Sequence, residues 1–140
     1  MNEFVLCVSG VDLDVDACLS TCPFTPVHVW RKATAKSDDG SDHGLQTSGF
    51  KIELGNASAG FHDQQKTATE FVRHHRNILK AMAQFPGVET FGLVLVFQVT
   101  LTSGLCGFMI SSSSELSWHA LDVGLSINTV VWLEQEDIND

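Results

Sequence analysis

Short runs of apolar residues along the chain predict six β-strands. In the first run, residues 4–9, nearly every position is apolar, which favours a strand buried on both faces. In residues 50–54 the apolar Phe50, Ile52 and Leu54 alternate with charged residues, as in a strand with one face in solvent. Apolar and β-branched residues predict the remaining strands over residues 27–32, 91–101, 105–110 and 127–133. A Thr-Ser-Gly turn joins the strand at residues 91–101 to the strand at residues 105–110, which predicts a hairpin.

Three segments with helical spacing separate these strands, over residues 14–21, 63–85 and 112–123. The longest has a capping box at Thr67–Glu70, with Asp63 as an alternative start one turn earlier. Its apolar residues recur on one face, and Pro86–Gly87 follows its end. Asp14 is expected to cap the first helix, and Gly124 is expected to end the third.

The element order is therefore β-α-β-β-α-β-β-α-β, which indicates an α+β fold. We expect a mixed, mostly antiparallel sheet with the helices packed on one face. A chain of 140 residues has the size of one domain, and no linker divides residues 1–140. The acidic tail from about residue 134 is expected to fray.

Charge is distributed unevenly along the chain. The formal net charge is −9, and all 8 Lys and Arg residues lie in residues 1–80. The remainder, residues 81–140, carries acids and no base, so it should repel nucleic acid and anionic membranes and attract a basic protein. The acids proposed as contacts with such a partner are Glu115, Asp122, Glu134, Glu136 and Asp137. Trp132, at the end of the last predicted strand, is the candidate buried anchor.

The sequence contains no complete motif for catalysis or metal binding. Asp12, Asp14 and Asp16 have the spacing of an EF-hand start, but Ala17 and Pro23 replace the glycine and glutamate that the loop requires. The six histidines show no His-x-x-x-His spacing, and the chain has no Gly-x-Ser-x-Gly elbow and no phosphate-binding glycine loop. We therefore expect no catalytic residue, no metal and no cofactor.

The first nine residues lack the basic start of a signal peptide, and the longest apolar run, residues 91–101, is shorter than the roughly 20 residues of a membrane span. This predicts a soluble protein of the cytoplasm. The four cysteines are accordingly expected to be free thiols.

Two motifs carry a family resemblance: Gly-Val-Asp-Leu-Asp-Val-Asp at residues 10–16, and a proline followed by an Arg-Lys pair at residues 26–32. With the long helix, hairpin and closing helix–strand unit, they resemble a bacterial family of unknown function numbered 4279. Small proteins of this kind are similar to immunity proteins encoded beside bacterial toxins. The resemblance implies a role in binding and implies no active site.

Three hypotheses follow for the function. The first is an immunity or antitoxin-type protein that binds and neutralises a cognate toxin domain, such as a basic nuclease. The second is a small cytosolic enzyme or ligand-binding domain with a cleft near His28, His43 or His62. The third is a structural homodimer or larger homo-oligomer.

Overall fold

The computed structural model of the protein describes residues 3–32, 46–56, 60–101 and 113–135, with the backbone alone for 97–101 and 131–135. Nine elements lie in these ranges. In chain order they are β1 (Glu3–Gly10), α1 (Val15–Ser20), β2 (His28–Trp30), β3 (Ser48–Glu53), α2 (Phe61–His74), α3 (Arg76–Ala83), β4 (Thr90–Leu101), α4 (Ser114–Val123) and β5 (Ser126–Gln135).

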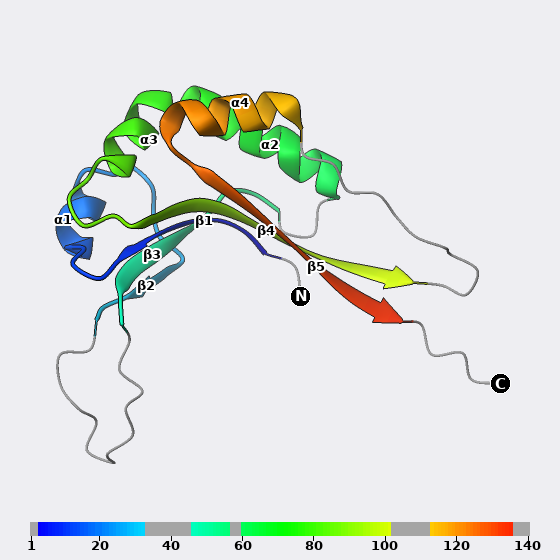
Figure 1. Ribbon diagram of the computed structural model, residues 1–140, viewed down its shortest axis with the longest axis horizontal. Coiled ribbons are helices and arrows are strands. Elements are labelled where there is room, and N and C mark those ends of the chain that lie inside the picture. Colours follow the sequence, from blue (N-terminus) through cyan, green and yellow to red (C-terminus); the bar gives the residue numbers. More distant parts are fainter. Residues whose placement is uncertain (1–2, 33–45, 57–59, 102–112, 136–140) are drawn as a thin grey trace, which may run out of the picture.

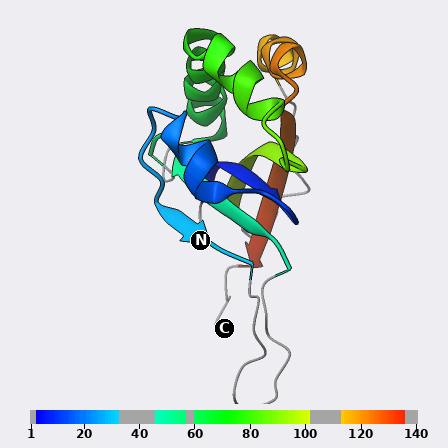
Figure 2. The same cartoon turned by 90° about the vertical axis from the view of Figure 1, so that its left-hand side faces the viewer.

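The five strands form one mixed sheet in the order β2-β3-β1-β4-β5. Neighbouring strands are antiparallel except β4 and β5, which are parallel because α4 carries the chain back across the sheet. Helices α2, α3 and α4 lie on one face of the sheet, and α1 lies at one end of it (Figures 1 and 2). The predicted α+β fold with a mixed, mostly antiparallel sheet is thus confirmed.

The core lies between the sheet and its helices, and β1 is at its centre. Alternate residues Phe4, Leu6 and Val8 are at most 1% exposed. Leu6 is opposite Ile52 of β3 and Leu93 of β4, both of which are buried. On the other face of the same strand Cys7 and Ser9 are half-buried. The prediction that both faces of this strand are buried is therefore wrong for its second half.

The long predicted helix is divided into α2 and α3 at His75, whose backbone (φ −114°, ψ 25°) leaves the helical region. Neither proline nor glycine causes this break. Instead, the His75 ring lies 4.9 Å from the rings of both Phe24 and Phe71, so aromatic packing occupies the junction. The hydrogen bond from Leu79 N to His75 O lets α3 begin at the next residue.

Other boundaries also differ from prediction. The second strand is limited to His28–Trp30, while β5 continues to Gln135 and so includes Glu134, which the sequence analysis assigned to a frayed tail. The predicted strand at residues 105–110, and with it the hairpin, lies outside the described residues. Within the part that is described, none of the helices is long and apolar enough to cross a membrane.

Candidate functional site

Helix α4 begins and ends with clear local signals. The Ser113 hydroxyl accepts a hydrogen bond from Leu116 N at 3.3 Å, which satisfies one of the free N–H groups of the first turn. At the other end Gly124 adopts φ 78°, a left-handed conformation that costs glycine little and other residues more. The chain then turns directly into β5. Sequence had predicted the last residue of this helix correctly and its start two residues too early.

Helix α4 has large apolar residues on both its inner and its outer side. On the inner side Leu116, Ala120 and Val123 are at most 2% exposed. On the outer side Trp118 is 74% exposed and Leu121 is 76% exposed. Because residues three apart on a helix are neighbours, these two side chains form one exposed apolar pair. This pair is hereafter called the α4 outer pair.

At the C-terminal end of α4 Asp122 is held by two cations of α3. Arg76 Nε lies 2.5 Å from its carboxylate, and Lys80 Nζ lies 3.5 Å from it. The hydrogen bond from Arg76 lowers the pKa of Asp122, and the positive charges of both cations add to this effect. The charge of Asp122 is therefore already balanced within the protein, which makes it a poor contact for a basic partner.

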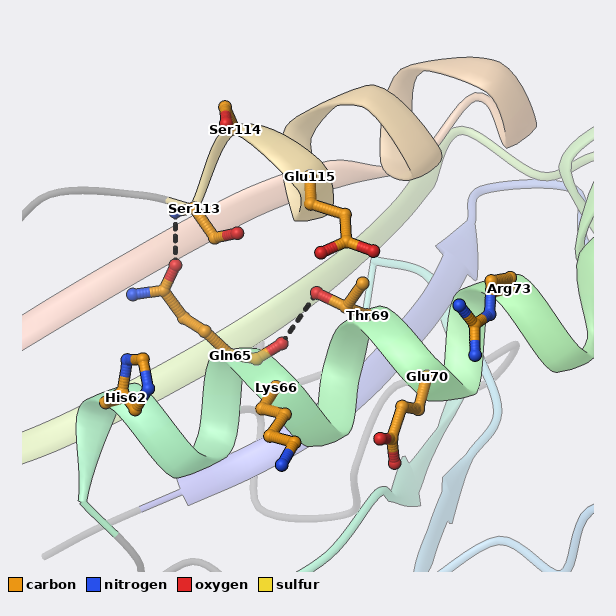
Figure 3. A pocket seen from close by; sticks show the side chains of 9 residues that line it. All are labelled: His62, Gln65, Lys66, Thr69, Glu70, Arg73, Ser113, Ser114 and Glu115. Carbon is orange, nitrogen blue, oxygen red and sulfur yellow. Dashed lines mark hydrogen bonds between the residues drawn. The ribbon is translucent and has the colours of Figure 1, made fainter.

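At the N-terminal end of α4 a cavity of about 570 Å³ lies between this helix and α2. The Gln65 side-chain oxygen of α2 accepts a hydrogen bond from Ser113 N and ties the two helices together, and the Thr69 hydroxyl donates to Gln65 O at 2.8 Å (Figure 3). The residues that line this cavity are His62, Gln65, Lys66, Thr69, Glu70, Arg73, Ser113, Ser114 and Glu115.

The predicted contact residues have different outcomes. Glu115 and Asp122 lie seven residues apart on α4, on the side that faces α2 and α3. Trp132 and Glu134 lie in the last five residues of β5, where only the backbone is described. Glu136 and Asp137 lie outside the described residues.

Among the histidines of the predicted cleft, His62 lines the cavity between α2 and α4. His28 lies on β2 instead, stacked on Trp30 with ring centroids 5.4 Å apart. His43 is not among the described residues. The structure therefore does not bring His28 to the cavity of His62.

Asp14 and Asp16 have partners within the protein, and the described cysteines form no disulfide. Asp14 caps α1 by accepting from Ala17 N at 3.1 Å, and Asp16 is paired with Arg31 at 2.7 Å. Cys7, Cys18 and Cys22 are free, and burial raises the pKa of Cys18 to about 11. No group of three potential metal ligands occurs within the described ranges.

The α4 outer pair is the feature that sequence reasoning missed. Five of the ten residues of α4 are large or small apolar residues, more than a single buried stripe requires. That excess was a readable signal of a second apolar side. It could not show which of the two sides would face the core.

No family model matches the chain, and no curated protein or solved structure is significantly similar to it. The resemblance to family 4279 therefore stays a prediction from its motifs. The function has to be inferred from the chain's own surfaces.

Proposed function

We propose that this protein is an immunity or antitoxin-type protein that binds and neutralises a basic toxin domain, such as a nuclease, in the bacterial cytoplasm. The observation that carries the proposal is the α4 outer pair, Trp118 and Leu121, which is exposed in a half of the chain that contains no Lys or Arg. A binding role explains the apolar pair, and the lack of Lys and Arg in residues 81–140 favours a basic partner.

Exposure of two neighbouring large apolar side chains is unfavourable in water. Full burial of one such side chain in a complex stabilises it by about 1.5–3 kcal/mol. Tryptophan is enriched among the few residues that dominate binding energy at interfaces. Trp118 therefore replaces Trp132 as the anchor that we favour, since its exposure is observed.

The acidic composition of residues 81–140 supports a basic partner. Asp122 is balanced by Arg76 and Lys80, which leaves Glu115 as the acid of α4 with no ion pair to another described residue. Further acids follow in β5 and in the tail, at Glu134, Glu136 and Asp137. Complementary charge of this kind mainly accelerates association, while buried anchors slow dissociation.

The test uses a toxin domain encoded beside the gene for this protein. Coexpression should protect cells from that domain, and the purified pair should bind. Trp118→Ala should speed dissociation by tenfold or more, the effect of losing a hot-spot residue of at least about 1.4 kcal/mol. Reversal of Glu134, Glu136 and Asp137 to Lys should slow association and weaken its salt dependence.

Val27→Ala is the matched control, because Val27 is a large apolar residue that is also exposed but lies before β2. It should leave dissociation unchanged. Equal effects of Trp118→Ala and Val27→Ala would contradict the assignment of the anchor. Absence of both protection and binding would contradict the proposed function, and dimerisation that Trp118→Ala abolishes would favour the homo-oligomer instead.

A second candidate function is ligand binding or catalysis at the cavity beside α4. The specific observation in its favour is that His62 lines this cavity together with Ser113, Ser114 and Glu115. His62→Ala separates the two functions. It should leave toxin protection intact if the protein acts by surface binding, and it should abolish activity if the histidine is a general base.

A further inference from the structure

Helix α4 carries two acids on one side, and they differ in whether a cation of the protein pairs with them. Asp122 is bound by Arg76 and Lys80 of the neighbouring α3. Glu115, seven residues earlier, lines the cavity between α2 and α4 and has no ion-pair partner among the described residues. Asp122 is thus paired with two cations of the protein, whereas Glu115 lies beside a cavity.

Two oxygen-bearing side chains at the start of α4 lie on the side of this space. In Figure 3 the Glu115 carboxylate points from α4 toward α2, above Thr69, whereas Lys66 and Glu70 point away from α4. The Ser113 hydroxyl lies on the same side and offers a further oxygen. Carboxylate and hydroxyl oxygens are the acceptors that a guanidinium group uses.

Two cations line the same cavity: Lys66, which points away from α4, and Arg73. The Arg73 guanidinium makes no ion pair with Glu115, although Arg76, one turn later along the chain, pairs with Asp122. Since Glu115 stands in the first turn of α4, the helix dipole stabilises its charge there. The dipole accounts for an acid at this position, but it does not fill the cavity beside the carboxylate.

We propose that this cavity receives an arginine side chain of the basic partner, with Glu115 as its counterion. The inference rests on the proposed function and specifies how the partner is recognised. The incoming guanidinium takes beside Glu115 the role that Arg76 has beside Asp122. Trp118 lies three residues after Glu115, so the ionic contact and the apolar anchor belong to one continuous surface of α4.

The test is an NMR titration of the whole protein, labelled with ¹⁵N, at low ionic strength with N-acetylarginine amide. N-acetylcitrulline amide, which has the same shape without the charge, is the control ligand. The arginine compound should shift the amide signals of Ser113–Leu116, Gln65 and Thr69, and the citrulline compound should not. Equal shifts with both compounds, or shifts elsewhere on the surface, would overturn the inference.

Three variants sharpen the result. Glu115→Gln should weaken binding about fivefold, the loss expected for one partly exposed ion pair. Glu53→Gln removes the same charge from an exposed site on β3 and should leave binding unchanged. Arg73→Gln should strengthen binding, because it removes a competing internal cation. A weaker site in Arg73→Gln, or an unchanged one in Glu115→Gln, would contradict the assignment.

The results distinguish a failure of the arginine site from a failure of the proposed immunity function. If a cognate toxin binds Glu115→Gln as tightly as the wild-type protein, the arginine site is wrong and the immunity function stands. If N-acetylarginine amide binds at Glu115 but no toxin is neutralised, the site is correct and the proposed function is wrong.

Discussion

The two helical segments that cover the sheet present different outer surfaces to solvent. The α2–α3 segment buries Val72, Leu79 and Met82 and exposes mostly charged or polar residues, as a surface helix does. Helix α4 buries an equivalent inner stripe but exposes Trp118 and Leu121 on its outer side. Both segments bury apolar residues in the core. The difference therefore indicates that the outer side of α4 is adapted to something other than folding.

The largest expected effect is the difference in stability loss between substitutions on the inner and outer sides of α4. Leu116→Ala removes a side chain that is 1% exposed and should lower the free energy of unfolding by about 2–5 kcal/mol. Trp118→Ala removes a larger side chain from the surface and should change it by no more than about 0.5 kcal/mol. Urea unfolding at neutral pH measures both. Similar losses for the two variants would show that Trp118 packs in the core.

The next effect concerns the end of α4. Gly124→Ala should cost about 1–2 kcal/mol, because its φ of 78° is unfavourable for a residue with a Cβ atom. The cost is conformational, since the added Cβ would be 3.5 Å from Ala83 Cβ, an ordinary contact. Gly60→Ala is the control, because Gly60 caps α2 with φ −64° and open space around it. Thermal unfolding should show the larger loss for Gly124→Ala, because Gly60→Ala loses only the modest preference for glycine over alanine at an N-cap.

A smaller effect should appear at the start of α4. Ser113→Ala removes the hydroxyl that caps Leu116 N and should cost about 1 kcal/mol. Ser113→Thr retains a capping hydroxyl and should recover most of the loss in urea unfolding. An unchanged stability for Ser113→Ala would mean that water replaces the cap at no cost.

The smallest effect is the pH dependence of the ion pairs at Asp122. Because Arg76 lowers its pKa in the folded protein, Asp122 stabilises the fold above the ordinary carboxyl pKa of about 3.9, and this contribution is lost as the pH falls through the lowered value. Wild type should therefore exceed Asp122→Asn in urea midpoint at pH 7. The difference should disappear at low pH and shrink in high salt. A difference that grows in acid would contradict this assignment.

Local signals were sufficient to predict most elements. The apolar run at residues 4–9 identified β1, though not that its second half has only one buried face, and Gly124 marked the end of α4. Tertiary features were not readable in this way. The parallel pairing of β4 with β5 depends on where α4 crosses the sheet, and the ring packing at His75 involves Phe24, which is distant in sequence.

The candidate site shows the same division. Sequence identified Glu115 and Asp122 as acids with no Lys or Arg nearby along the chain. In the folded protein this does not hold for Asp122, which lies beside two cations. Arg76 and Lys80 lie more than forty residues before it and meet it only because α3 packs against α4. Trp118 was not singled out because periodicity counts apolar residues without showing which of them meet the core.

Helix α4 is attached to the rest of the protein at both of its ends. Gln65 of α2 binds the backbone at Ser113, and Arg76 and Lys80 of α3 bind Asp122, with Leu116, Ala120 and Val123 buried between them. The backbone beneath Trp118 and Leu121 is thus fixed before any partner arrives. Binding through this helix would order few backbone torsions, so little of the interaction energy would be lost as conformational entropy.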